Sequence, residues 1–379
     1  MLNQIGAYGT FADRLLGKKT GALSLRSGQF KSVAAWRKQS RARVLELLAP
    51  PPLPVPRCRV VARGEYDGLA WEKLQWQLPW GPPTDAVFLK PLSAGKGQRL
   101  PAVLALHDHG GNKYFGWRKI ADISGPVHPL VRKHRKNGYG GLAWANEAAR
   151  RGYAVLVHDT FAFASRRVLL KDLLPEVRNA GIDPGVDEKP EDILAYNAWA
   201  AGHENLMAKS LFSAGTTWPG LFLRDDQAAL SVLCGRRDVD PKRVACGGLS
   251  GGGLRTVFLA GLDDRIRCCF CAGFFTTWRD FMLNKAWTHT WMTFVPLLPR
   301  ELDFSEILTL RAPRPTLVQQ CDRDPLFTLS EVKRASTMAR ETYRLANAPN
   351  AYRFSLYPGA HVLNAAMQKE AFDWFEKWL

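Results

Sequence analysis

The sequence predicts an α/β protein built on a mostly parallel sheet with helices on both faces. From about residue 100 onward, strand-like segments alternate with helix-like segments, which is the pattern of strand-helix-strand units. Several apolar runs show no polar alternation, as expected for strands that are covered on both faces. The chain has 379 residues, of which 46% are hydrophobic, so it can bury one large core.

The individual strands are expected where short apolar runs end in polar or glycine-rich turns. Those expected in the parallel part of the sheet are 101–107, 151–159, 244–249, 267–272, 314–321 and 352–357. Segments 57–62 and 69–76 alternate in polarity, and 86–89 is a third candidate of this kind. Such alternation is typical of an antiparallel edge that leads into a parallel sheet.

We expect two parts, a helical extension with a proline-rich linker over 1–56 and the main domain over 57–379. Apolar stripes at 33–36 and 44–48 indicate helices in the extension, and prolines crowd 50–56. Two stretches, near 161–219 and 273–312, are longer than ordinary connections, and such insertions usually carry function. We expect them to form a cap whose aromatic rings line a substrate pocket, above all Trp278, Trp287 and Trp291. An equally strong interpretation is that these rings form the cap's own core.

Ser250 is the candidate nucleophile. It lies in Gly248-Leu249-Ser250-Gly251-Gly252, after the predicted strand 244–249 and before an amphipathic segment. A strained strand-to-helix turn leaves no room for side chains two residues before and two after the serine, which explains the glycines. The helix N-terminus then directs free N–H groups towards the reaction centre. Taken alone, the segment is equally compatible with a flexible loop.

A carboxylate and a histidine follow Ser250 in the order that a serine nucleophile on this architecture requires. Asp324 comes after the predicted strand 314–321 and is expected to orient the base, with Asp322 in the same loop as the alternative. His361 follows the last predicted strand in a Pro-Gly-Ala-His turn and is the candidate general base. The ordered set is far more specific than the glycine-rich turn alone.

A His-Gly-Gly turn after the predicted strand 101–107 is expected to complete the site. A backbone N–H of His109, Gly110 or Gly111 can stabilise an oxyanion together with the N–H of Gly251. The alternative for this region is a metal site at 107–109, but no further ligand at a characteristic spacing accompanies it. We therefore expect neither a metal nor another cofactor.

These motifs resemble those of α/β-hydrolases of the dienelactone-hydrolase and acetyl-xylan-esterase-like branch. The resemblance covers most of the chain. It rests on His109-Gly110-Gly111, 151–159, 239–244 leading into the turn at Ser250, 262–266, Asp324 and His361. It implies the α/β-hydrolase fold and ester hydrolysis. Dienelactone hydrolases proper carry a cysteine nucleophile, so a serine at position 250 favours a carboxylesterase.

The expected activity is hydrolysis of a small-molecule or carbohydrate ester through an acyl-enzyme formed on Ser250. A serine peptidase or amidase of the same fold uses the same machinery and is the first alternative. A non-catalytic binding protein on a hydrolase scaffold is the second, and the intact set of serine, acid and histidine weighs against it.

Charge and cysteine content restrict the partners. The net charge of +17 favours encounters with anionic substrates, although a solvated basic face is the simpler interpretation of this charge. The densest run of basic residues, 132–136, is expected to lie in a loop. No nucleic-acid-binding fold is visible, and no apolar run reaches membrane-spanning length. Seven cysteines, three of them in the predicted strand 267–272, suit a reducing compartment. With no secretory pattern at the start, a cytoplasmic location is expected.

Overall fold

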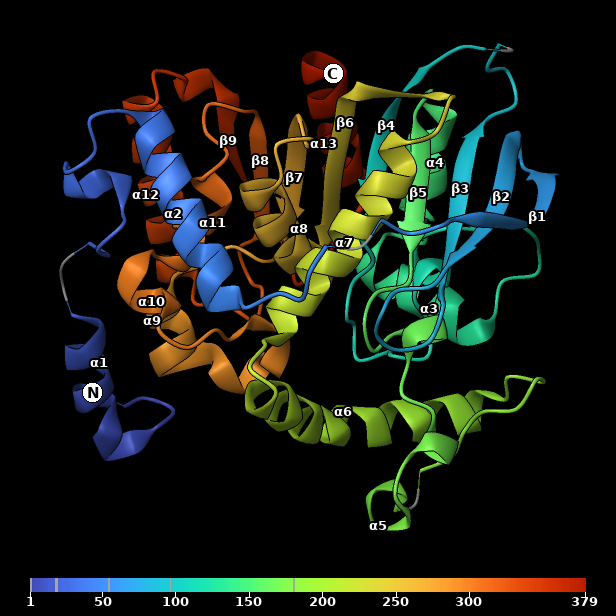
Figure 1. The fold of residues 1–379 in the computed structure, drawn as a ribbon, viewed down its shortest axis with the longest axis horizontal. Coiled ribbons are helices and arrows are strands. Elements are labelled where there is room, and N and C mark those ends of the chain that lie inside the picture. Colours follow the sequence, from blue (N-terminus) through green and yellow to red (C-terminus); the bar gives the residue numbers. More distant parts are fainter. Residues whose placement is uncertain (1, 18–19, 54, 96, 180) are drawn as a thin grey trace.

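The protein is described by a computed structural model that covers residues 2–17, 20–53, 55–95, 97–179 and 181–379. At its centre is a nine-stranded sheet in the order β1-β2-β3-β5-β4-β6-β7-β8-β9 (Figure 1). The strands are β1 (Arg59–Tyr66), β2 (Leu69–Trp76), β3 (Thr84–Pro91), β4 (Leu100–Ala105), β5 (Ala154–His158), β6 (Val239–Leu249), β7 (Cys268–Ala272), β8 (Thr316–Cys321) and β9 (Tyr352–Tyr357). The pairings from β1 to β5 are antiparallel and those from β5 to β9 are parallel. The predicted mostly parallel sheet with an antiparallel edge is confirmed.

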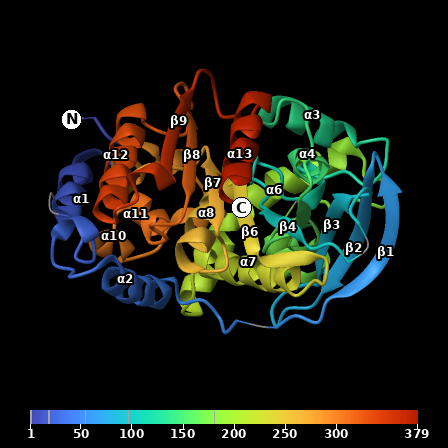
Figure 2. The same ribbon diagram turned by 90° about the horizontal axis from the view of Figure 1, so that it is seen from above.

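Helices cover both faces of this sheet (Figure 2). One face carries α4 (Trp144–Arg150) and α13 (Ala365–Trp378), and the other carries α2 (Val33–Leu48), α7 (Trp218–Cys234), α8 (Gly251–Leu262) and α12 (Leu329–Leu345). Val103 and Leu104 are neighbours in β4 and are both fully buried, yet they belong to different hydrophobic clusters. Because successive side chains of a strand point to opposite faces, the uninterrupted apolar runs follow directly from this double covering.

The N-terminal extension lies along the side of the molecule that carries α8 and α11 (Phe304–Thr309), with Arg41 bound to Gly261 and Ser24 bound to Glu306. After α1 (Gly9–Leu16), the two predicted apolar stripes form one helix, α2. The Ser32 side chain accepts the N–H of Ala35 at its start, an ordinary N-cap. Trp36 is fully buried and donates to the Leu23 carbonyl at 2.8 Å. The division of the chain at residue 56 stays a prediction.

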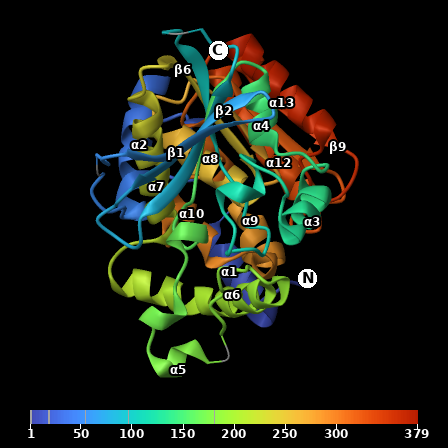
Figure 3. The same cartoon turned by 90° about the vertical axis from the view of Figure 1, so that its right-hand side faces the viewer.

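The two long insertions lie at the carboxyl edge of the sheet. The first contains α5 (Pro175–Arg178) and α6 (Pro190–Ser213), and α6 runs beneath the ends of the central strands (Figures 1 and 3). The second contains α9 (Trp278–Asp280), α10 (Leu298–Glu301) and α11 (Phe304–Thr309). Among the described helices, none combines the length and the apolarity needed to cross a membrane.

The basic run at 132–136 is helical, so its assignment to a loop was wrong. It forms most of α3 (Pro129–Gly138), which has a proline in its first turn. At the start of this helix, Nδ1 of His128 accepts the N–H of Leu130. The Arg135 side chain is buried and donates to the carbonyls of Arg118 and Ala121. Polar contacts with residues outside the helix therefore stabilise its position, and the sequence of the helix alone does not predict them.

Candidate active site

Ser250 lies at the sharp turn between β6 and α8. Its backbone has φ 56° and ψ −118°, a region that costs a non-glycine residue free energy and that persists only where the surroundings enforce it. Its N–H donates to the Ala272 carbonyl at the end of β7, at 2.9 Å. The serine is therefore held in a strained conformation between two parallel strands, as in a nucleophile elbow.

The glycines around Ser250 are required by close backbone contacts. A Cβ at position 248 would lie 2.3 Å from the Leu106 carbonyl oxygen, and one at position 252 would lie 2.2 Å from the same atom. A Cβ at position 251 would lie 2.7 Å from the backbone nitrogen of His109. The segment is a packed turn, and its interpretation as a flexible loop is excluded.

Asp324 and His361 are brought together from two different loops. Oδ2 of Asp324 lies 2.6 Å from Nδ1 of His361, and Oδ1 accepts the N–H of Leu326 at 3.0 Å. Asp324 is 7% exposed. The alternative acid, Asp322, instead accepts the N–H of Gly359 and so stabilises the loop that carries His361. The structure thus brings Asp324 and His361 together, and the role of Asp324 as the orienting acid stays a prediction.

The other nitrogen of His361 is available for chemistry. Within the described residues, Nε2 of His361 is buried and has no hydrogen-bond partner, and no hydrogen bond joins it to Ser250 Oγ. The ring packs against Gly273, where a Cβ would lie 2.9 Å from Cε1 of His361. Gly273 follows Ala272, the residue that accepts the N–H of Ser250. Hydrogen bonds of such sites often form only when substrate binds.

Three of the predicted oxyanion donors have no partner. The N–H groups of His109, Gly110 and Gly251 donate to no other residue in the part of the chain that the structure describes. Gly111, the remaining predicted donor, donates its N–H to Nδ1 of His109 at 3.0 Å. Gly110 has φ 53°, and a Cβ there would lie 2.3 Å from Asp108 Oδ2, so the turn needs glycine for its shape.

The side chains at 107–109 have separate partners and do not converge. His107 Nδ1 lies 3.0 Å from the Asp108 carbonyl. The Asp108 carboxylate accepts from Tyr139 Oη at 2.6 Å and is 3.0 Å from His134 Nε2. The His109 ring is directed towards α6. The metal-site interpretation of this segment therefore has no support in the geometry.

Glu204 of α6, which the sequence reasoning missed, binds the His-Gly-Gly turn. Its Oε1 lies 2.9 Å from Nε2 of His109 and 2.7 Å from Nζ of Lys113. Glu204 is 5% exposed, and these partners lower its pKa against the opposing effect of burial. These contacts hold α6 against the loop that follows β4, at the carboxyl edge of the sheet. No local pattern marks Glu204, because its partners are about ninety residues away.

The three tryptophans predicted to bind substrate line one apolar cavity of about 560 Å³ together with Phe212, and Ser250, Asp324 and His361 are absent from the lining. Trp278 is 3% exposed and packs on Phe304, with ring centroids 5.1 Å apart. It belongs to the core of the insertion, as the alternative interpretation held. Trp287 is 74% exposed. A substrate-binding role for these residues stays a prediction.

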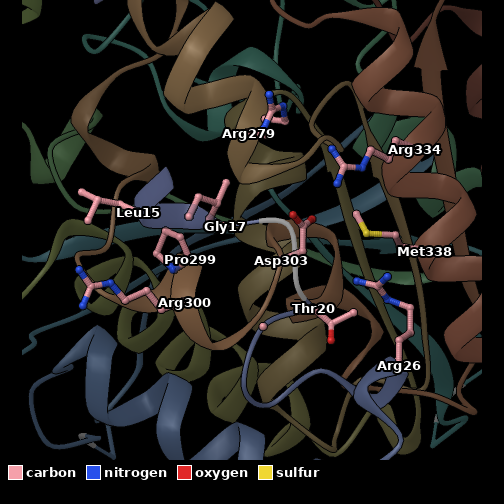
Figure 4. Close-up of a pocket in the computed structure, with 12 residues that line it drawn as sticks. Leu15, Gly17, Thr20, Arg26, Arg279, Pro299, Arg300, Asp303, Arg334 and Met338 are labelled. Carbon is pink, nitrogen blue, oxygen red and sulfur yellow. The ribbon is translucent and has the colours of Figure 1, made fainter. Parts of the chain in front are cut away.

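A second cavity, of about 400 Å³, lies where the N-terminal extension meets α9, α10 and α12 (Figure 4). Two of its lining arginines pair with carboxylates of other elements: Arg26 binds Glu306 at 3.2 Å, and Arg279 binds Asp13. Burial raises the pKa of Asp303, in the same cavity, to about 7. The two ion pairs connect the extension to the main domain.

Comparisons with known proteins agree with this geometry. The family model described as "Prolyl oligopeptidase family" matches residues 216–379, the part that carries Ser250, Asp324 and His361. A protein of Bacillus subtilis (strain 168) named "Putative hydrolase YtaP" is 29% identical over 299 residues, which are 78% of this chain and 83% of that protein.

Two solved structures share the fold. A "putative acetyl xylan esterase" from Bacteroides fragilis NCTC 9343 superposes with a TM-score of 0.68 at 17% identity, covering 93% of this chain and 82% of the other. A glucuronoyl esterase from Solibacter usitatus gives 0.62 at 15% identity, covering 95% and 98%. Together with the strand order and the elbow, these similarities show that the chain has the α/β-hydrolase fold.

Proposed function

We propose that the protein is a serine carboxylesterase in which Ser250 is the nucleophile, His361 the general base and Asp324 the residue that orients the base. The observation that carries the proposal is the 2.6 Å contact between Asp324 and Nδ1 of His361, which leaves the opposite nitrogen buried and unpartnered. A base held in one tautomer by a buried carboxylate is what activation of a serine hydroxyl requires.

In the first half of the proposed reaction, His361 takes the proton of Ser250 as the oxygen attacks the ester carbonyl. The resulting oxyanion accepts from the N–H groups of Gly251 and His109, neither of which has another partner among the described residues. Collapse of the tetrahedral intermediate expels the alcohol, which receives the proton from His361. In the second half, His361 activates water, which releases the acid and restores the serine.

For the substrate, we propose an ester of a small molecule or a carbohydrate with a short acyl group. The solved neighbours named as an acetyl xylan esterase and a glucuronoyl esterase both act on carbohydrate esters by their names. The net charge of +17 further favours an anionic ester.

The test compares hydrolysis of p-nitrophenyl acetate, butyrate and octanoate by the wild type and by Ser250→Ala. We expect turnover in the wild type that is fastest with acetate, and a loss of several orders of magnitude in the variant without a change in melting temperature. A fluorophosphonate should label the wild type and not the variant. Turnover that survives Ser250→Ala would refute the mechanism.

A serine peptidase is the second candidate because the matched family model is that of prolyl oligopeptidases. Peptide p-nitroanilides distinguish it from an esterase. Cleavage of these amides with kcat/KM equal to or above that of the acetate ester would replace the esterase proposal with a peptidase.

A further inference from the structure

Lys119 is a buried lysine whose ammonium, among the described residues, makes its polar contacts with the segment that carries the oxyanion turn. Its side chain is fully buried at the end of a short 3₁₀ turn (Trp117–Lys119). Its ammonium donates to the carbonyls of Asp108 at 2.7 Å and His109 at 2.9 Å. Oδ2 of Asp108 lies 3.9 Å away. One ammonium therefore contacts three oxygens of two successive residues.

The contact with the Asp108 carbonyl helps to set the direction of the next N–H, although Nδ1 of His107 also lies 3.0 Å from this carbonyl. The peptide unit is planar and trans, so the carbonyl of residue 108 and the N–H of residue 109 point in opposite directions. With the carbonyl directed at Lys119, the N–H of His109 is directed away from it. The elbow is close by, since the His109 nitrogen is 2.7 Å from where a Cβ of residue 251 would be.

We propose that Lys119 is a positioning residue that fixes and polarises the peptide between Asp108 and His109, so that the His109 N–H stabilises the oxyanion formed at Ser250. The inference rests on the proposed esterase function. A cation on the carbonyl side increases the partial positive charge of the N–H on the other side, and a preorganised donor in a dry site stabilises a developing oxyanion strongly.

Burial of Lys119 disfavours its charged form, and neighbouring carboxylates partly offset this effect. Burial lowers the pKa of Lys119 to about 8; Asp108 and Asp159 raise it, whereas Lys113 and Arg255 lower it further. The ring of Phe163 covers the ammonium at 4.8 Å. A buried ammonium is expensive, and an apolar side chain of similar volume fills such a space at lower cost. A lysine used only for packing would therefore be a poor choice.

The neighbouring Asp108 carboxylate strengthens the arrangement. Despite its burial, His134 and Lys119 hold the pKa of Asp108 well below its usual range. Tyr139 and His134 bind Oδ1 of Asp108, while Oδ2 faces Lys119. The ammonium thus has a fixed counter-charge beside the two carbonyls, which keeps its position defined.

The experiment measures kcat and KM for p-nitrophenyl acetate in Lys119→Met and Lys119→Arg, per active site titrated with a fluorophosphonate. Loss of one oxyanion donor lowers kcat by roughly 10²-fold, so we expect Lys119→Met to lower kcat by about this factor with KM almost unchanged. The affinity for an aryl trifluoromethyl ketone, which forms a tetrahedral adduct with the serine, should fall by the same factor. Lys90→Met is the control, because the ion pair of Lys90 that the structure describes is with Asp238, far in sequence from the oxyanion turn.

Lys119→Arg keeps a cation and should recover part of kcat. The wild type should lose kcat/KM as the pH rises through about 8, where Lys119 loses its proton, and this decline should be absent in Lys119→Arg. Far-UV circular dichroism at each pH separates this loss from unfolding. If Lys119→Met does not fold, the comparison of the pH profiles of the wild type and Lys119→Arg is sufficient to test the role of Lys119.

Two results overturn the proposal separately from the esterase function. One is a Lys119→Met protein whose kcat per titrated site equals that of the wild type, and the other is a pair of pH profiles that coincide for the wild type and Lys119→Arg. A wild type that neither hydrolyses esters nor reacts with the fluorophosphonate would instead overturn the esterase function, and this inference with it.

Discussion

Replacement of Gly252 by alanine tests the tight contact between the elbow and β4. The new Cβ would lie 2.2 Å from the Leu106 carbonyl oxygen and 3.0 Å from its carbonyl carbon. Both obstacles are backbone atoms, so no side-chain rotation relieves the contact. The helix start and the end of β4 must move apart.

The size of the movement follows from the distance. Carbon and oxygen atoms in ordinary contact are about 3.2 Å or more apart, so relief requires a displacement of about 1 Å, and a displacement of that size can cost roughly 10²-fold in rate. The displacement separates the N–H of Gly251 from that of His109, since these groups lie on the two segments that are forced apart. Overpacking of this kind costs about 1–3 kcal/mol of stability.

The assay is kcat/KM for p-nitrophenyl acetate together with the melting temperature. Gly202→Ala is the matched control: Gly202 lies inside α6, and a Cβ there meets nothing within 4 Å. The control should keep full activity and gain slightly in stability, because alanine favours a helix over glycine. A Gly252→Ala protein with wild-type activity and melting temperature would refute the steric account of the elbow.

Two further substitution pairs separate chemistry from packing. Asp324→Asn should lower kcat for p-nitrophenyl acetate by about 10³-fold or more, because the amide cannot hold the His361 tautomer. Asp322→Asn can still accept the N–H of Gly359, so its kcat should stay close to that of the wild type. Equal losses of kcat in the two variants would refute the assignment of Asp324 as the orienting acid. Trp278→Ala should lower the free energy of unfolding, measured with urea, by about 3–5 kcal/mol because the ring is buried. Trp287→Ala should lower it by less than about 0.5 kcal/mol because that ring is exposed. A larger loss for Trp287→Ala than for Trp278→Ala would refute the assignment of Trp278 to the core of the insertion.

The fold and the elbow could be predicted because their signals are local. The strands that lie between two helical layers are continuous apolar runs, and β9 was expected over the residues that form it. The glycines at 248 and 252 are dictated by backbone contacts next to the serine. The order of serine, acid and base then follows from the order of the strands that carry them.

The supporting residues could not be predicted because their contacts are distant in sequence. Glu204 reaches His109 across 95 positions, and nothing in the sequence of α6 marks it. Lys119 is ten residues from the carbonyl of His109, but a lone lysine beside Arg118 looks like any solvated residue. The choice between Asp322 and Asp324 likewise depended on the shape of the loop after β8.

The way in which the N-terminal extension is attached has a consequence for synthesis. Arg41 donates to the Gly261 carbonyl, Ala22 donates to the Arg300 carbonyl, and Ser24 binds Glu306. These partners lie more than 200 positions later in the chain. Since a ribosome adds residues from the N-terminus onward, the extension leaves it long before its binding surface exists. The extension is therefore made well before much of the surface that binds it, and α2 makes part of its contacts only after the final third of the chain has been added.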